Sequence, residues 1–270
     1  MTKILLTMTG ALTLSVALWA QKQPQPKSQK EVEAIMAIQN AADPEARIKA
    51  AENLITKFAD TEFKEFALQM ETISYQQNND FENMVIAGER TLEVNPDNVV
   101  VLITLAQAIP QRTKEFDLDK EEKLGKAEKF AKKAQTLIPN LAKFNPQISD
   151  EEWAGYKKSA MSQAHEALGM VSFTRKNYAA AEQSFKSAVD VSPQADATTL
   201  YRLAMAYSAQ NKYDDAIGAL DKAIAAGGVQ VGGKDLAAEQ KATVMKAKAA
   251  GGSKPAESAP APPQVEIKRP

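Results

Sequence analysis

The chain has 270 residues, of which 44% are hydrophobic, 6% are aromatic and none is cysteine. It is long enough to bury a continuous core, and without cysteine it can form neither disulfides nor thiol-based sites. Its 33 basic and 34 acidic residues leave a formal net charge of −1. This balance gives no electrostatic reason to expect nucleic acid or an anionic membrane as the main partner.

Residues 1–20 have the features of an export signal. Lys3 is followed by a mostly apolar stretch from Ile4 to Leu18, and Ala20 is a small residue at a plausible cleavage point. An uncleaved membrane anchor is the alternative, but the stretch is interrupted by Thr and Ser and is short for a span of ~20 apolar residues. We expect a cleaved signal peptide, a periplasmic or secreted protein of bacterial type, and no membrane contact after cleavage.

Two tails flank the part of the chain with helical patterning. Residues 21–30 form a polar, proline-bearing linker, and residues 251–270, rich in proline and alanine, are predicted to be disordered. Between them, residues 31–250 are predicted to form one helical repeat domain.

In the first half of this domain, the sequence predicts helix pairs whose residue patterns match one another only loosely. Residues 32–41 and 44–58 form a first pair, and residues 65–98 form a second pair that turns at Asn79 to Phe81. A third pair is interrupted by a polar insertion from Pro110 to Glu122. Insertions at turns cost little closure entropy. Within this insertion we expect Asp119 to cap the following helix.

A single long helix is predicted from about Asp150 to Arg175. Ser149 followed by Glu152 forms a capping box, in which each side chain satisfies an amide of the first turn. Two glycine pairs at 227–228 and 232–233 predict a flexible turn, and residues 235–249 predict a final helix whose polar outer face would cap the stack.

Two stretches near the C-terminal end repeat one another with an offset of thirty-five residues. Large and small positions recur in the same order, as Leu168, Gly169, Tyr178, Ala181, Phe185 and Ala188 and then as Leu203, Ala204, Tyr213, Ala216, Leu220 and Ala223. This pattern resembles the tetratricopeptide repeat, a unit of roughly 34 residues. The resemblance is clearest at 162–195 and 197–228, and it implies an all-α, right-handed solenoid of antiparallel helix pairs with a C-terminal capping helix.

The resemblance also implies a concave groove lined by the first helix of each pair. The ligand-facing positions of that family fall on six residues, which are Glu166, Met170, Phe173, Tyr201, Met205 and Ser208. Methionine and aromatic side chains there would give a peptide adaptable apolar contacts. The alternative is that some of them pack against a neighbouring helix. A clamp for a C-terminal carboxylate is not indicated, because Glu166 and Met170 occupy the corresponding places.

Other candidate chemistry favours structural roles. His165 is the only histidine and matches a packing position of the repeat. Asp117, Asp119 and Glu121 loosely resemble the start of a calcium loop, whose fourth acidic position falls on Glu128, but Glu122 stands where that loop requires glycine. We therefore predict no catalytic residues, no metal site, no cofactor and no enzymatic activity.

These observations favour an exported adaptor or scaffold that binds a protein or peptide partner in a helical groove, for example in cell-envelope assembly. Two alternatives remain open from the sequence. One is a structural subunit that self-associates, and the other is an accessory protein that binds a small molecule or a glycan.

Overall fold

The computed structural model describes residues 24–192 and 194–251, so the predicted signal peptide and C-terminal tail lie outside the described residues. Within them the chain forms eleven α-helices, one short 3₁₀ helix and a two-stranded hairpin. In chain order these are α1 (Gln29–Gln39), α2 (Pro44–Lys57), α3 (Lys64–Gln77), α4 (Phe81–Val94), α5 (Val99–Arg112), α6 (Lys120–Leu137), η1 (Ile138–Asn140), α7 (Asp150–Thr174), α8 (Tyr178–Val191), α9 (Ala197–Ser208), α10 (Tyr213–Ala225), β1 (Gln230–Val231), β2 (Lys234–Asp235) and α11 (Leu236–Ala249).

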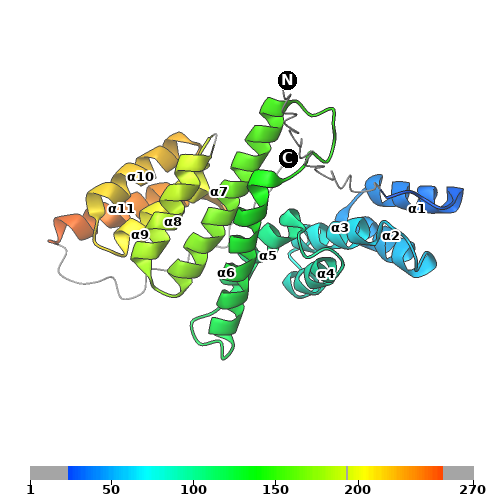
Figure 1. Ribbon diagram of the computed structural model, residues 1–270. Coiled ribbons are helices and arrows are strands. Elements are labelled where there is room, and N and C mark those ends of the chain that lie inside the picture. Colours follow the sequence, from blue (N-terminus) through cyan, green and yellow to red (C-terminus); the bar gives the residue numbers. More distant parts are fainter. Residues whose placement is uncertain (1–23, 193, 252–270) are drawn as a thin grey trace, which may run out of the picture.

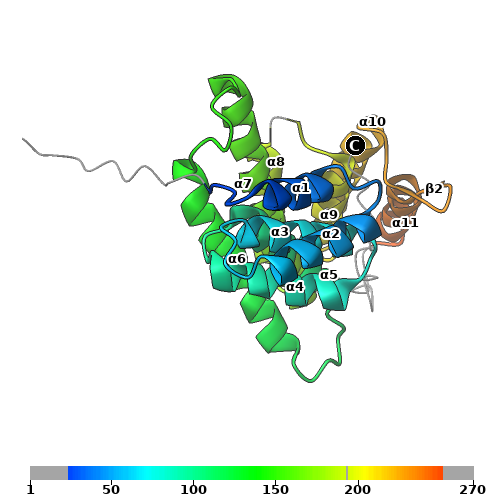
Figure 2. The ribbon, with the colours of Figure 1, turned by 90° about the vertical axis from the view of Figure 1, so that its right-hand side faces the viewer.

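Consecutive helices pair and stack into an elongated array around α7. Figure 1 shows α7 extending from the top of the molecule through its centre, with α1–α6 on one side and α8–α11 on the other. Turned by 90°, the same structure shows the α1–α4 pairs stacked in front, while one end of α7 projects beyond them (Figure 2). The hydrophobic core is divided in the same way, into one cluster over α1–α3, three over α4–α7 and one over α7–α11. Because α7 contributes to both of the last two regions, it joins the two halves of the stack.

The turns between paired helices share one geometry in three places. Asn79, Lys176 and Asn211 each adopt a left-handed backbone, with φ of 57°, 61° and 60°. In each turn the residue after it donates its backbone N–H to a carbonyl five residues earlier, at 2.9 to 3.0 Å. This is the bonding of a Schellman motif, which satisfies the last carbonyls of the first helix. The α3–α4 hairpin therefore shares its turn geometry with the α7–α8 and α9–α10 hairpins, and it turns where the sequence predicted.

The start of α7 agrees with its sequence, whereas the start of α6 does not. Ser149 and Glu152 form the expected capping box, and α7 continues without a break to Thr174. The helix α6 does begin after Asp119, but that side chain makes no capping hydrogen bond. Its carboxylate instead pairs with the Lys123 Nζ at 2.9 Å. The prediction of Asp119 as a capping side chain was wrong because a lysine one turn later competes for it.

The insertion before α6 is shorter than predicted. Pro110 is buried inside α5, which continues to Arg112. A proline so close to a helix end removes only one of the last hydrogen bonds, so the helix can include it. The irregular part of the insertion is limited to residues 113–119.

The C-terminal glycine pairs form a hairpin that positions the last helix. Gly232 and Gly233, with φ of 56° and 80°, turn β1 into β2. The carboxylate of Asp235 then accepts hydrogen bonds from the backbone N–H groups of Val229 and Ala237, at 2.9 and 3.0 Å. The helix α11 packs beside α10 with Ala237 and Val244 buried. None of the helices among the described residues is both long enough and apolar enough to span a membrane.

Candidate binding groove

The structure places five of the six predicted groove residues in its interior. Met170 and Met205 are each 1% exposed, and Glu166, Phe173 and Tyr201 are 4 to 6% exposed. Only Ser208 is half-buried. Four of the five join the core cluster of α7–α11, which also contains Val229, Ala237 and Val244 from the C-terminal segment. The assignment of these five residues to an open groove is therefore corrected, because the chain's own side chains fill that space.

Glu166 belongs instead to a buried polar network between successive first helices. It forms an ion pair with Arg202 of α9, and both side chains are almost fully buried. It also accepts hydrogen bonds from the Thr199 Oγ1 at 3.3 Å and from the Gln107 Nε2 at 3.1 Å. The Nε and Nη2 of Arg202 have no partner within the described structure. A charge buried here is stable only while it stays paired, so the network fixes the relative positions of α5, α7 and α9.

An open groove does exist, one repeat nearer the N-terminus. Its volume is about 720 Å³, and it lies between the C-terminal half of α3, the start of α4, the length of α5 and the N-terminal half of α7. Seventeen residues line it, and these are Ile73, Gln76, Gln77, Asn79, Phe81, Met84, Val100, Ile103, Thr104, Gln107, Ala108, Gln111, Arg112, Tyr156, Ser159, Ala160 and Gln163. Three of the four contributing helices are first helices of their pairs, so the groove follows the inner side of the stack.

The lining of this groove is rich in carboxamides and almost free of charge. Six of its side chains are Asn or Gln, and none is Asp, Glu or Lys. Arg112 at the end of α5 supplies the one charged group in the lining. Arg112 is exposed and has no hydrogen bond or ion pair with another described residue. The groove therefore combines apolar contact area with neutral hydrogen-bonding groups and one available cation.

Aromatic rings hold one wall of the groove in place. Tyr156 stacks on Trp153 with ring centroids 4.9 Å apart and planes 10° apart. The indole Nε1–H of Trp153 donates to the backbone oxygen of Leu141 at 3.2 Å, and Phe144 meets both rings edge-on. Burial raises the pKa of the Tyr156 phenol, so the ring stays neutral at physiological pH. Stacking of this kind limits the rotamers of Tyr156 and gives the groove a rigid edge.

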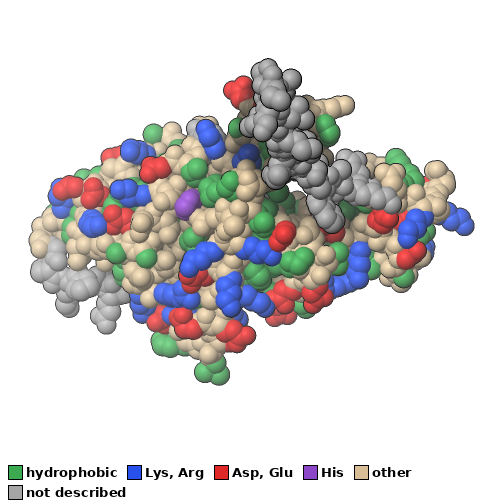
Figure 3. All heavy atoms as spheres, in the orientation of Figure 1, with side chains coloured by type: hydrophobic (Ala, Val, Ile, Leu, Met, Phe, Trp, Pro, Cys, Tyr) green, Lys and Arg blue, Asp and Glu red, His purple; other side chains and the backbone are tan. Residues whose placement is uncertain are grey.

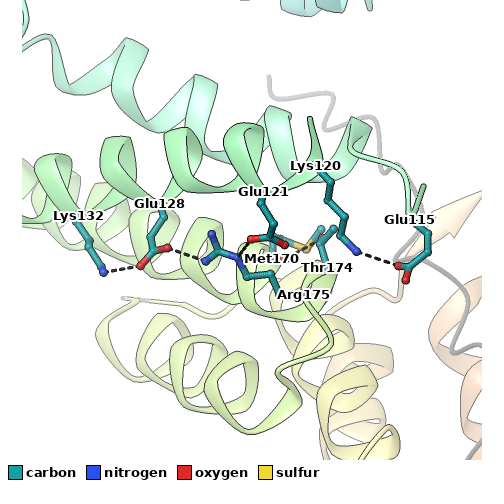
Figure 4. Close-up of polar contacts among 8 residues, drawn as sticks. All are labelled: Glu115, Lys120, Glu121, Glu128, Lys132, Met170, Thr174 and Arg175. Atoms are coloured by element: carbon teal, nitrogen blue, oxygen red, sulfur yellow. Dashed lines mark hydrogen bonds and ion pairs between the residues drawn. The ribbon is translucent and has the colours of Figure 1, made fainter. Parts of the chain in front are cut away.

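The acidic stretch that loosely resembled a calcium loop is used in ion pairs (Figure 4). At the end of α7, Arg175 lies between two carboxylates of α6, with its Nε 2.9 Å from Glu121 and its Nη1 2.7 Å from Glu128. The hydrogen bond from Arg175 is the main cause of the lowered pKa of Glu128. Glu115 bridges Lys120 and Lys176 at 3.0 and 2.8 Å. These contacts tie residues 113–119 to the α7–α8 turn.

Two other features of the surface bear on the sequence predictions. In Figure 3, acidic and basic side chains are interspersed on the face over α6, in keeping with the balanced composition. His165, visible on this face, is half-buried, and its Nδ1 lies 3.0 Å from the Gln135 Nε2. Burial lowers the pKa of the imidazole. Within the described part of the chain, no three His, Asp or Glu side chains are grouped closely enough to hold a metal ion.

The residues of the observed groove were not identified from the sequence. The prediction used the two well-matched repeats, whereas the groove lies over the divergent ones. The available signal was the recurrence of glutamine on successive first helices, at Gln76, Gln107 and Gln163. Glutamine is an ordinary helix surface residue, so its spacing carried no information until the positions of α3, α5 and α7 were known.

Comparison with known proteins finds a sequence match over one region of the chain and a structural match over most of its length. Residues 160–226 match the tetratricopeptide repeat family. A thermophilic TPR protein from Thermus thermophilus has a similar structure, with a TM-score of 0.53 over 80% of this chain and 99% of that chain, at 17% sequence identity. No curated protein matches the chain in sequence. The comparison of structures thus concerns the fold alone, and it extends well beyond the region matched by sequence.

Proposed function

Because this chain is a tetratricopeptide-repeat protein, we propose that it is a non-enzymatic adaptor whose groove between α3, α5 and α7 binds a segment of a partner protein. Proteins of this fold generally mediate protein–protein interaction. The observation that carries the proposal is the groove itself, which is the large open concavity on the inner side of the stack. Its volume is within the range of about 300–1,000 Å³ that is typical of ligand sites.

The composition of the groove suits a peptide. Apolar side chains such as Val100, Ile103 and Met84 line it together with carboxamide and hydroxyl groups. A few polar groups on a mainly apolar surface are the usual arrangement for orienting a bound ligand. None of the six residues predicted from the sequence lines this groove. Glu166 contributes indirectly, because it accepts a hydrogen bond from the lining residue Gln107.

The proposal is tested by blocking the groove with a bulky side chain. Ser159 is exposed and lines the groove, so a tryptophan there should fill the space without unfolding α7. We expect random-sequence peptides displayed on phage to be enriched by the purified wild-type chain. Binding of the enriched peptides should weaken by about tenfold or more in Ser159→Trp, which corresponds to about 1.4 kcal/mol.

The matched control is Gln183→Trp, which places the same side chain at an exposed position of α8, outside the groove lining. It should bind the peptides as the wild type does. Failure to enrich any peptide, or equal binding by Ser159→Trp and the wild type, would contradict the proposal.

We also propose that the chain is exported and works in the periplasm or outside the cell, for example in an envelope assembly. The support is the sequence of residues 1–20, which lie outside the described residues. Expression of the full chain in a bacterium should yield a mature protein whose intact mass lacks about the first twenty residues. Recovery of the full-length mass from the soluble fraction would contradict export.

A further inference from the structure

The hydrogen bonds that orient two glutamine side chains of the lining indicate which class of ligand the groove binds. We propose that the groove binds a partner segment in extended conformation, reads its main chain through Gln77 and Gln107, and selects an acidic side chain through Arg112. This inference depends on the proposed function, because it specifies what the same groove accepts.

The orientation of the Gln107 carboxamide is set by Glu166. Its Nε2 donates to the Glu166 Oε2 at 3.1 Å, and Glu166 also receives hydrogen bonds from Arg202 and Thr199. A carboxylate surrounded by three donors can only accept, so Gln107 must direct its NH₂ group toward it. The carbonyl oxygen of Gln107 therefore remains as an acceptor for a donor in the groove.

The carboxamide of Gln77 is oriented in the opposite sense. The Arg47 Nη1 donates to the Gln77 Oε1 at 3.0 Å. A guanidinium group has only donors, so Gln77 must present its oxygen to Arg47 and keep its NH₂ group. Gln77 lies on α3 and Gln107 on α5, so the two sides of the groove present one donor and one acceptor.

A donor on one side and an acceptor on the other match the polar groups of an extended peptide. In each trans peptide unit of such a chain, the C=O group of one residue and the N–H group of the next point to opposite sides. The α5 lining runs from Val100 to Arg112, a length of about 18 Å at about 1.5 Å per residue. An extended chain advances about 3.3 Å per residue, so this length accommodates about five residues.

The charge of the lining selects the side chain. Arg112 is the one charged group among the lining residues, and no lining carboxylate competes for it. Glu166, the buried carboxylate that contacts the lining residue Gln107, is already paired with Arg202. A guanidinium group without an ion partner favours a carboxylate, which it can bind through two parallel hydrogen bonds. The groove therefore fits an extended segment with Asp or Glu within it.

The test compares the sequences and affinities of peptides selected from the random-sequence phage library. Peptides enriched by the wild-type chain should share Asp or Glu at one position, and those enriched by Arg112→Gln should not. Changing that Asp to Asn in a synthetic peptide should weaken binding to the wild type by about tenfold, and should leave binding to Arg112→Gln almost unchanged.

Three further measurements test whether the acidic preference comes from Arg112 itself, and whether binding involves the C-terminus or the main chain of the peptide. Lys114→Gln removes the same charge from an exposed position outside the lining, so it should keep the acidic preference. Amidation of the peptide C-terminus should leave binding unchanged. Gln77→Ala should weaken all selected peptides by a similar factor whatever their side chains, because it removes a contact to the main chain.

The outcomes separate this inference from the proposed function. Groove-dependent binding without an acidic preference, equal effects of Lys114→Gln and Arg112→Gln, or loss of binding on C-terminal amidation would each overturn the inference while the groove function stands. Absence of any groove-dependent peptide binding would overturn both.

Discussion

Glu71 occupies a position where the repeat pattern calls for leucine, and the structure shows the energetic consequence. Its side chain is 2% exposed, its Oε1 has no hydrogen-bond partner in the described structure, and the Arg90 Nη1 lies 3.5 Å from its Oε2. Desolvation raises the pKa of Glu71 to about 7 and outweighs the opposing effect of Arg90. At neutral pH this carboxyl group is thus close to its titration midpoint in the folded protein.

The free energy of unfolding should therefore fall as the pH rises from 4.5 to about 7. A carboxyl group with a pKa of about 4.5 in the unfolded chain and about 7 in the folded chain stabilises the folded state fully below pH 4.5. That contribution, about 3 kcal/mol, is lost progressively as the pH rises from the unfolded pKa through the folded pKa. Glu71→Gln keeps the shape and cannot ionise, so it should match the wild type at about pH 4 and exceed its stability at about pH 8.5.

The measurement is urea unfolding of both proteins across this pH range. Both contain His165, whose pKa is lowered by burial, so its titration cancels in the difference between them. Parallel stability curves for the two proteins would show that Glu71 does not titrate in this way.

At the level of helices, the contact between α7 and α8 depends on matched volumes. Gly169 faces the ring of Phe185, and a Cβ added at Gly169 would lie 2.5 Å from two ring carbons. In the next repeat the corresponding pair is Ala204 and Leu220. The larger Phe185 thus pairs with glycine, and the smaller Leu220 pairs with alanine, as close packing of the two hairpins requires.

Two glycines of α7 should respond oppositely to alanine. Gly169→Ala should destabilise the protein by about 2 kcal/mol, because Phe185 is 1% exposed and its ring has no room to move. A Cβ added at Gly155 would have no neighbouring atom within 4 Å, apart from the backbone of its own helix and its chain neighbours. Gly155→Ala should therefore stabilise the same helix by about 1 kcal/mol through helix propensity alone.

Chemical denaturation measures both effects in the same helix. Adding Phe185→Leu to Gly169→Ala reproduces the pair found in the next repeat and should recover most of the loss. Destabilisation by both alanines, or no recovery in the double variant, would contradict this account of the interface.

At the scale of the whole molecule, the sequence predicted the stack more accurately than the site. Helix pairs, the long α7 and the repeated turns follow from short-range signals such as apolar spacing, a capping box and the recurring turn residues. The site depends on how far apart the first helices lie, and that distance is set by packing between repeats. Tyr201 and Met205 have the same local pattern whether they face a groove or a core, and the C-terminal segment decides between the two.

The same reasoning explains why Arg202 and Glu166 could not be assigned from the sequence. Each is a charged residue on an amphipathic helix, which normally indicates a solvated face. Their burial results from contact between α7 and α9, across residues thirty-six positions apart. The sequence of one helix contains no signal for such a pair.

The last helix limits how the molecule can assemble with copies of itself. Among its described residues α11 buries Ala237 and Val244, and Met245 is its one large hydrophobic side chain exposed to solvent. A further helix pair stacked on that end would find a single large apolar side chain of α11 to cover. An open-ended filament needs a different contact surface at each end of its subunit, so the scarcity of large apolar side chains on α11 disfavours filaments in which the α1 end of one copy stacks on the α11 end of the next.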